Sequence, residues 1–385
     1  MSIIAVDGVV MRYPWGRTDL ISRLLGRDTD SDTPEAELWF GAHKNGASPV
    51  RGGSQHVTLT DLIAADPALM LGADVAARFN ATLPFLLKVL AVNEPLSLQV
   101  HPDEHWVETL SVEGDTDQVL ADLNPKPEMI VAVGELVAFC GLQPDVDAAA
   151  IARSINAAAW DTLAGEIELH GVRTVVANLI CADTDRISRL FTALCDALDG
   201  GWDEPHADAV RDLTRRYPFD RAVVITVLMR LVMLHDGDAL YIPPGVLHCY
   251  LYGAGVEVMA SSDNVFRVGL TGKRCHPALV ARIVLATDEE PVLVAADRDG
   301  ATTHFLAPTD WFSLSRVRVT PGACRMPAHP TGPSLILTML GQVTVHTNGT
   351  AVALPRGTAA FIPAGVDVTC EGDADVFWAR LGAQV

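Results

Sequence analysis

The segment Pro95–Pro102 carries the densest group of polar side chains in an otherwise apolar part of the sequence. Side chains two residues apart on a β-strand share a face, so Ser97, Gln99 and His101 are predicted to point the same way. If that face is buried, the three side chains line a cavity, because buried polar groups need partners. If the strand lies at a sheet edge, they are solvated. The pattern alone leaves both interpretations open.

Two distant side chains could join this group. His248 follows the turn Pro243–Gly245, and Glu128 begins an apolar run. A lone His is more often a core or surface residue than a ligand, and a carboxylate at the start of a strand can cap a turn. With Gln99 and His101, however, they offer the N and O ligands that Zn²⁺ binds at about 2.0–2.2 Å. Sequence spacing does not show that the four converge.

A third group of polar residues lies in Gly255–Lys273, where charged and amide side chains are interspersed with apolar ones. One interpretation is a turn at Ser261–Asn264 with surface charges. The other is an anion site, because Arg267 offers a planar fork to phosphate and Lys273 a compact charge. Lysine is rare in this chain. The four lysines are Lys44, Lys88, Lys126 and Lys273.

Composition limits the partners of the protein. Among 385 residues, 48 are acidic and 28 are Lys or Arg, giving a net charge of −20. This balance excludes extended polyanions such as nucleic acid or an anionic membrane. The longest apolar run is interrupted by Arg230, well short of the ~20 residues that a spanning helix needs. With no signal peptide and seven cysteines without a CxxC pair, we expect a soluble, cytoplasmic protein.

The elements that must position these residues are mostly strands. The first hundred residues have the pattern of short strands and turns, and strand patterns return after His235. Between them, residues 144–234 are Ala-rich and helical in pattern, most clearly Asp183–Leu198, which the glycines 200 and 201 end. The sequence predicts a mainly β protein with a helical insert.

An internal repeat links the two β regions. Gly237–His248 aligns without gaps on Gly357–Val368, with matching Gly, Ala, Ile, Pro, Gly and Val. Turn chemistry could produce so short a match by coincidence. The flanking strand patterns favour a duplicated β-barrel or jelly-roll module. Because Val368 stands where the first copy has His248, any chemistry that needs this histidine belongs to the first copy.

Seven segments, taken in order, closely resemble the type I phosphomannose isomerases, zinc enzymes of the cupin-like β-barrel class that interconvert mannose 6-phosphate and fructose 6-phosphate. The segments are Tyr13–Gly16, Ala36–His43, Leu83–Leu90, Pro95–Pro102, Lys126–Met129, Gly237–Tyr250 and Ser262–Lys273. The resemblance implies two cupin-like jelly-roll β-barrel modules plus an α-helical domain. We expect residues 1–143 and 235–285 to form the catalytic domain with the zinc site, 144–234 the helical insert domain, and 286–385 a C-terminal jelly-roll domain without metal.

The resemblance also implies roles for single residues. One Zn²⁺ per chain would be bound by Gln99, His101, Glu128 and His248, and Arg267 matches the residue usually assigned to catalysis. Other positions match the family's substrate pocket. These are Ser97, Lys88, Lys126, Glu257, Asp263 and Lys273. Three of the four lysines therefore fall on matched pocket positions.

One departure from the family concerns Asn124–Met129. The family commonly has a histidine where this chain has Pro125, so a proton transfer assigned to that histidine, such as ring opening, must be done here by another group or by water. A milder change is Gly272, where the family usually has proline. The predicted zinc ligands are unaffected.

The predicted reaction moves a proton between adjacent carbons through an enediolate, whose charge a bound zinc can stabilise. Candidates for the base are Glu257, Lys126, Asp263 and a zinc-bound water. The alternative is a non-catalytic, cupin-like sugar-phosphate-binding regulator with structural zinc; a metal-dependent oxygenase fits Gln99 poorly. We expect a small sugar phosphate as partner, no nucleic acid and no membrane, and a monomer, although the sequence does not exclude an oligomer.

Overall fold

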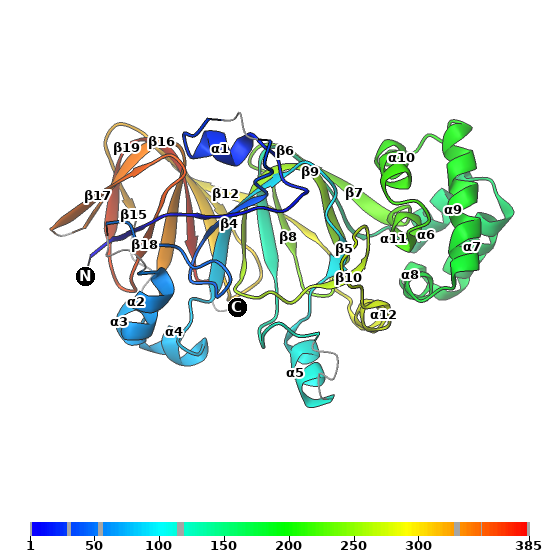
Figure 1. Ribbon diagram of the computed structural model, residues 1–385, viewed down its shortest axis with the longest axis horizontal. Helices are drawn as coiled ribbons and strands as arrows, with labels where there is room; N and C mark the ends of the chain where they lie inside the picture. The colour runs from blue at the N-terminus through cyan, green and yellow to red at the C-terminus, as the bar shows by residue number, and fades with distance from the viewer. Residues whose placement is uncertain are drawn as a thin grey trace.

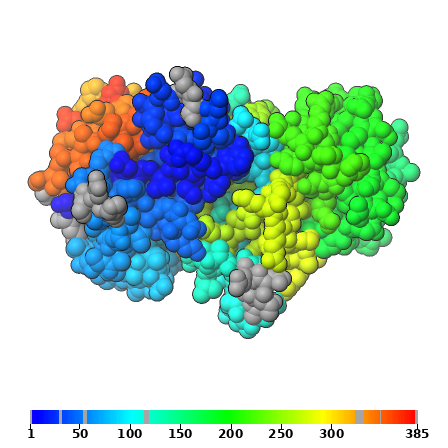
Figure 2. Space-filling view, viewed as in Figure 1, coloured from blue at the N-terminus to red at the C-terminus, as the bar shows by residue number. Residues whose placement is uncertain are grey.

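The computed structural model describes residues 2–28, 32–52, 57–113, 119–326, 332–347 and 349–382. Its strands form two antiparallel sheets, and a group of helices lies at the end of the molecule beyond the first sheet (Figure 1). Figure 2 shows the same order on the surface, with the C-terminal residues at one end and the helical lobe at the other. No helix among the described residues is long and apolar enough to cross a membrane.

The first sheet holds the strands that carry the predicted site. Its main path is β11 (Val292–Val294), β8 (Ala239–Ile242), β6 (Glu128–Leu142), β9 (His248–Ala260), β4 (Phe85–Val92), β3 (Glu37–Phe40) and β2 (Val9–Met11). Three strands pair off this path: β5 (Leu98–Val100), β7 (Met229–Leu234) and β10 (Phe266–Gly269). Strand β9 pairs with β4, β5 and β6, so it lies at the centre of the sheet.

The second sheet is formed mainly by the C-terminal residues. Its main path is β1 (Ile4–Val6), β18 (Ala359–Ile362), β16 (Ser334–Thr347), β19 (Val368–Arg380), β14 (Ser313–Val319), β13 (Thr302–Phe305) and β12 (Ala296–Asp299). Strand β15 (Ala323–Met326) pairs with β19, and β17 (Thr350–Pro355) pairs with β16.

The two sheets repeat one strand arrangement, as the internal repeat predicts. Strands β8 and β18 each have 4 residues, and β9 and β19 each have 13. In the first sheet Glu128 of β6 lies opposite Ile242 and Met259, and in the second Ser334 of β16 lies opposite Ile362 and Arg380. The predicted mainly β fold with a duplicated module and a helical part is therefore confirmed.

Helices lie in five separate parts of the chain that the structure describes. The large group between β6 and β7 is α6 (Asp145–Ser154), α7 (Ala158–His170), α8 (Val172–Ile180), α9 (Thr184–Asp199), α10 (Ala207–Arg216) and α11 (Arg221–Thr226). The others are α1 (Leu20–Leu24), α2 (Leu59–Ala65), α3 (Pro67–Leu71), α4 (Ala73–Arg78), α5 (Glu104–Glu113) and α12 (Pro277–Ala286).

Helix α9 confirms the prediction for residues 183–198. The carboxylate of Asp183 accepts the backbone N–H of Arg186 at 2.7 Å, and Gly200 is the C-cap. The apolar face expected from the spacing, which includes Phe191 and Leu194, is buried. It packs into a core that α7, α8 and α11 share with β6, β9 and β10.

Two secondary-structure predictions are wrong. The first hundred residues contain α2, α3 and α4 as well as strands; Thr58 and Asp61 form a capping box for α2, and Asp66 with Pro67 begins α3. Residues 229–234 form strand β7 instead of helix, because their backbone pairs with residues 136–142 of β6. A short apolar run does not distinguish a buried strand from a helix by its period.

Each sheet also takes a strand from the other part of the chain. Strand β1 pairs with β18 in the second sheet, and β11 pairs with β8 in the first. The domain boundaries at residues 143, 234 and 285 remain a prediction. Each sheet contains a strand from a segment that this prediction assigns to the other β domain. One core joins Leu87 and Val258 of the first sheet with Leu337 and Phe361 of the second.

We predict that this shared core stabilises the whole molecule. Leu337→Ala removes a fully buried side chain and should lower the free energy of unfolding by about 2–5 kcal/mol. The matched control is Leu340→Ala on the same strand, where the side chain is 55% exposed, with an expected change within about 0.5 kcal/mol. Urea unfolding followed by tryptophan fluorescence measures both, and equal losses would contradict the packing described.

Candidate metal centre and active site

Three buried side chains from strands of the first sheet, or directly following one, converge on one point. Glu128 begins β6, His248 begins β9, and His101 directly follows β5. The carboxylate oxygen Oε2 of Glu128 lies 3.2 Å from Nε2 of His101 and 3.5 Å from Nε2 of His248. All three side chains are almost fully buried, and their potential ligand atoms lie within 4.8 Å of one another. The predicted convergence of these residues is present.

Backbone contacts orient both imidazoles toward this point. Nδ1 of His101 lies 2.7 Å from the carbonyl oxygen of Asn264, and Nδ1 of His248 lies 2.9 Å from that of Val246. Each Nδ1 therefore carries the ring proton and donates it, which leaves Nε2 with a lone pair. Nε2 of His101 is buried and makes no hydrogen bond. A buried nitrogen lone pair without a donor is available to bind a metal.

The charge states of the cluster also suit a metal. Burial lowers the pKa of His101 to about 4, against the opposing effect of Glu128, so the ring is neutral at pH 7. Burial by itself raises the pKa of Glu128, but His101 and Lys126 hold it well below its usual value. Neutral imidazole and ionised carboxylate are the forms that bind Zn²⁺. The residues present fit a zinc ion.

Gln99 lies beside this cluster with its amide oxygen turned away. In β5 it is the register partner of His248, and its Nε2 lies 3.4 Å from Nε2 of that histidine. Its Oε1 accepts the hydroxyl proton of Ser97 at 2.9 Å. A metal takes the amide oxygen, so a half-turn of the amide is needed to make Gln99 a ligand. The structure thus brings Gln99 to the site without presenting its ligand atom.

A cavity of about 610 Å³ opens over the metal cluster. Nine of the eleven predicted site residues line its wall, and His101 and His248 lie buried beneath it. The lining residues among those predicted are Lys88, Ser97, Gln99, Lys126, Glu128, Glu257, Asp263, Arg267 and Lys273. The predicted polar face of residues 97–101 is therefore a cavity wall, while Leu98 and Val100 on the other face are fully buried in the core.

One part of the wall carries two cations, Arg267 and Lys273, that form no ion pair with a described carboxylate. Arg267 of β10 is the register partner of Gln99 and makes no ion pair with any residue that the structure describes. Burial lowers the pKa of Arg267, and burial together with the nearby Arg267 lowers the pKa of Lys273. Two cations that lie close together and form no ion pair with a described carboxylate provide a site for an anionic group.

Another part of the wall is a buried cluster of opposite charges. Lys88 of β4 forms an ion pair with Glu257 of β9, and the Tyr250 hydroxyl donates to Glu257 Oε1 at 2.9 Å. Burial by itself lowers the pKa of Lys88, but Glu257 and Glu37 raise it above its usual value. Burial raises the pKa of Glu257, although Lys88 opposes this. The lysine is therefore a fixed cation.

Sequence reasoning missed Glu37 and Asn45 as site residues. Glu37 of β3 lines the cavity 3.9 Å from Nζ of Lys88 and accepts the indole proton of Trp39. Asn45 lines the cavity and donates to Asp263. Glu37 lies inside segment 36–43, and the resemblance of this segment to the family was a signal that could have identified it. Asn45 lies after that segment, and the sequence contained no signal for it.

Comparison with known proteins identifies the family. A family model described as "Phosphomannose isomerase type I, catalytic domain" matches residues 3–145. Mannose-6-phosphate isomerase 1 of Arabidopsis thaliana is 30% identical over 402 residues, covering 97% of this chain and 92% of that protein. Mannose-6-phosphate isomerase of Shigella flexneri is 31% identical, covering 94% and 95%. The chain belongs to the type I phosphomannose isomerase family.

Solved structures of the family have the same fold. A zinc-bound mannose 6-phosphate isomerase matches with a TM-score of 0.89 at 27% identity, and the match covers 100% of both chains. An arginine-to-alanine variant of phosphomannose isomerase from Salmonella typhimurium matches equally, with a TM-score of 0.89 at 27% identity over 100% of both chains. Zinc in the first of these family members agrees with the His101–Glu128–His248 cluster found here.

We predict that His248→Ala abolishes tight zinc binding. Losing a hydrogen-bond partner of a metal ligand costs about 10–100-fold in affinity, so losing the ligand itself should cost at least about 100-fold. The control is His235→Ala, which removes an exposed histidine in the turn before β8. Metal content after dialysis against a weak chelator measures both. Full zinc occupancy in His248→Ala would contradict the assignment of this ligand.

Proposed function

We propose that the protein is a mannose-6-phosphate isomerase that interconverts D-mannose 6-phosphate and D-fructose 6-phosphate with the help of zinc. One observation carries the proposal. One cavity joins a three-residue metal cluster to Arg267 and Lys273, which form no ion pair with any residue that the structure describes. A sugar phosphate has hydroxyl and carbonyl oxygens at one end and a dianion at the other, which matches this arrangement. Family membership supports the same activity.

The metal end of the cavity would hold the reacting carbons. A zinc ion on His101, Glu128 and His248, with Gln99 as a fourth ligand, would supply a Lewis acid that stabilises negative charge on the sugar oxygens. Lys126 donates to Glu128 Oε1 at 2.9 Å and lines the cavity, so it places a second positive charge beside the same oxygens. Buried charges act strongly here because little water screens them.

The basic part of the wall would bind and align the substrate. Lys273, with Ser97 as a further donor, would hold the phosphate, and Arg267 would stabilise the oxyanion that develops during proton transfer. Binding energy from the phosphate then aligns the reacting carbons. The proton that moves between C1 and C2 would be carried by Glu257, Lys126 or Asp263, the three ionisable groups of the lining that were predicted as candidates.

The proposed organisation follows from where these residues lie. All eleven site residues fall within 1–143 and 235–285, so we assign the catalytic domain to these segments, with 144–234 as helical insert and 286–385 as a domain without metal. One cluster of this kind among the described residues supports one zinc per chain. We also propose a monomeric, cytoplasmic enzyme, as the sequence indicates.

The first test of the function is turnover. Zinc-loaded protein should convert mannose 6-phosphate to fructose 6-phosphate in an enzyme-linked assay, and it should incorporate solvent deuterium at C1 or C2. Chelation should remove the activity, and added zinc should restore it. Tight binding of the sugar phosphate without turnover or deuterium exchange would instead support a regulator with structural zinc. Absence of both binding and turnover would overturn the proposal.

A second prediction concerns the guanidinium of Arg267. Arg267→Ala should lower kcat/KM by about 100-fold or more, because it removes a preorganised positive charge from the cavity. Arg267→Lys should recover only part of this loss, since a point charge lacks the planar fork. The control is Arg298→Ala on the exposed strand β12 of the second sheet, which should leave kcat/KM unchanged. Steady-state kinetics with zinc-loaded proteins measures kcat/KM for all three variants and the wild type.

A further inference from the structure

Arg267 and Lys273 lie in one closed loop, which begins in β10 and ends before α12. The backbone N–H of His276 donates to the carbonyl oxygen of Arg267 at 2.9 Å and closes the loop. Residues 270–273 line the cavity, and the ammonium group of Lys273 lies 5.4 Å from the ring centre of Tyr13, another lining residue. The conformation of this loop therefore decides where Lys273 stands in the wall.

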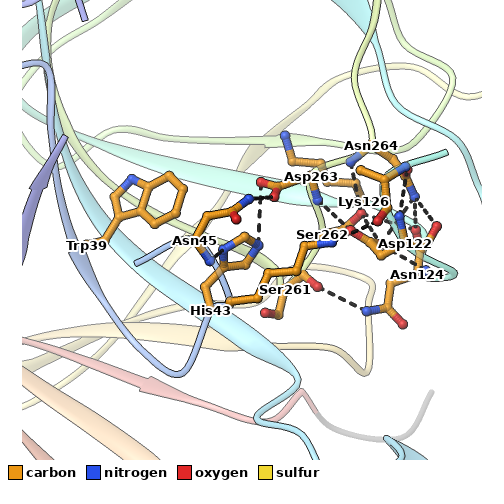
Figure 3. A network of polar contacts seen from close by, with 12 residues as sticks. Trp39, His43, Asn45, Asp122, Asn124, Lys126, Ser261, Ser262, Asp263 and Asn264 are labelled. Carbon is orange, nitrogen blue, oxygen red and sulfur yellow. Dashed lines mark hydrogen bonds and ion pairs between the residues drawn. The ribbon is translucent and has the colours of Figure 1, made fainter. Parts of the chain in front are cut away.

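The segment before β10 is held from within the part of the chain that carries the metal cluster (Figure 3). The N–H of Asp263 donates to Oδ2 of Asp122 at 2.8 Å, and the hydroxyl of Ser262 donates to Oδ1 of Asp122 at 2.8 Å. Nε2 of His43, whose side chain is buried, lies 3.4 Å from Oδ1 of Asp263. The loop after β10 has a different support, which comes from the helical lobe formed by α6–α11.

One carboxylate of the helical lobe reaches this loop. Asp220 is the N-cap of α11, and its Oδ1 accepts the backbone N–H of Ala222 at 2.9 Å. Its Oδ2 accepts the backbone N–H of Leu270 at 2.8 Å. Tyr217, three residues before Asp220, lines the cavity. The two oxygens of Asp220 thus join the first turn of a lobe helix to the cavity wall.

The residue that Asp220 binds has an unfavourable backbone conformation. Leu270 has a φ of 56°, in the left-handed region that is costly for a residue with a Cβ. Its side chain is almost fully buried, in the core that α11 shares with β10. A conformation of this kind persists only where the surroundings enforce it. Here the carboxylate of Asp220 and the packing against the lobe enforce it.

Gly269 leaves room for the carboxylate. A Cβ at this position would overlap Oδ1 of Asp220, so a larger residue would push the carboxylate away. The register of β10 against β5 shifts between Arg267 and Gly269, and β10 ends at Gly269. The strand ladder therefore stops where the contact with Asp220 begins.

We propose that Asp220 is a positioning residue for substrate binding, through which the helical lobe holds the 267–276 loop and presents Lys273 to the phosphate. This role rests on the proposed function, which supplies the sugar phosphate. Without the carboxylate, the N–H of Leu270 loses its acceptor and the loop is released from its left-handed conformation. The substrate must then order the loop when it binds, and this cost lowers its affinity.

The main test replaces Asp220 by Ser, a good N-cap that has one side-chain oxygen instead of two. The probe is mannitol 1-phosphate, a sugar-alcohol phosphate that has no carbonyl group and cannot be isomerised. Calorimetric titration of the zinc-loaded variant should show about tenfold weaker binding than wild type. KM for mannose 6-phosphate should rise about as much, while kcat changes by less than about twofold and zinc content is unchanged.

Hydrogen exchange and a matched variant separate this role from general destabilisation. Amide exchange in residues 266–276 should be faster in Asp220→Ser, because the N–H of Leu270 has lost its acceptor. The control is Asp183→Ser at the N-cap of α9, where the carboxylate accepts the backbone N–H of Arg186 in its own helix. Binding, KM and exchange of residues 266–276 should all be unchanged in this control.

Two further variants locate the effect. Adding Asp220→Ser to Lys273→Ala should weaken binding of the probe no further, because both changes remove the same contact, whereas a merely structural loss would add. Gly269→Ala displaces the carboxylate without changing Asp220, and it should weaken binding of the probe about as much as Asp220→Ser. It also replaces Asp220→Ser in the test if that variant does not fold.

Unchanged binding or unchanged exchange in Asp220→Ser and Gly269→Ala would overturn the role of Asp220, as would additive losses in the double variant. Wild-type protein that binds the probe but does not isomerise mannose 6-phosphate contradicts the proposed function, and the binding data then still judge Asp220. Wild-type protein that isomerises normally while Asp220→Ser keeps its affinity contradicts only the role of Asp220. Wild-type protein that neither binds nor isomerises a sugar phosphate contradicts both.

Discussion

The pairing of β9 with three neighbours is the constraint that builds the site. Its first residue, His248, lies opposite Gln99 of β5, and Glu257 near its other end lies opposite Lys88 of β4. On the other side, β6 pairs with β9 along most of its length, with Glu128 opposite Met259. A side chain alternates faces with each residue, so a one-residue slip of β9 would turn its site residues away from the cavity.

Burial of charge in this cavity is balanced by pairing of opposite charges. Lys88 lies with Glu257 and Glu37, and Lys126 lies with Glu128. Removing one partner of such a pair would leave an uncompensated buried charge, which is costly. Arg267 is the exception, because no described carboxylate pairs with it. The net charge of −20 thus coexists with a local basic surface that fits a small dianion.

Much of the fold could be predicted from local patterns. The capped, amphipathic helix at 184–199 and the repeat that became β8–β9 and β18–β19 both have strong sequence signals. Local patterns failed where partners decide the conformation. Residues 229–234 form a strand because they pair with β6. Strand β1 pairs with β18 of the second sheet, although the two strands lie far apart in the sequence. Strand pairing between distant segments leaves no local signal.

The sequence by itself determined which side chains could do the chemistry: the metal-binding types at 101, 128 and 248, the scarce lysines, and the motifs that mark the family. Only the tertiary structure decided how those groups are used. It turned the amide oxygen of Gln99 toward Ser97, left Arg267 without an ion pair to any described carboxylate, and placed buried His43 behind Asp263. The physical reason is that ligand geometry and hydrogen bonding depend on distances of a few ångströms between residues far apart in the chain, which strand register and packing fix.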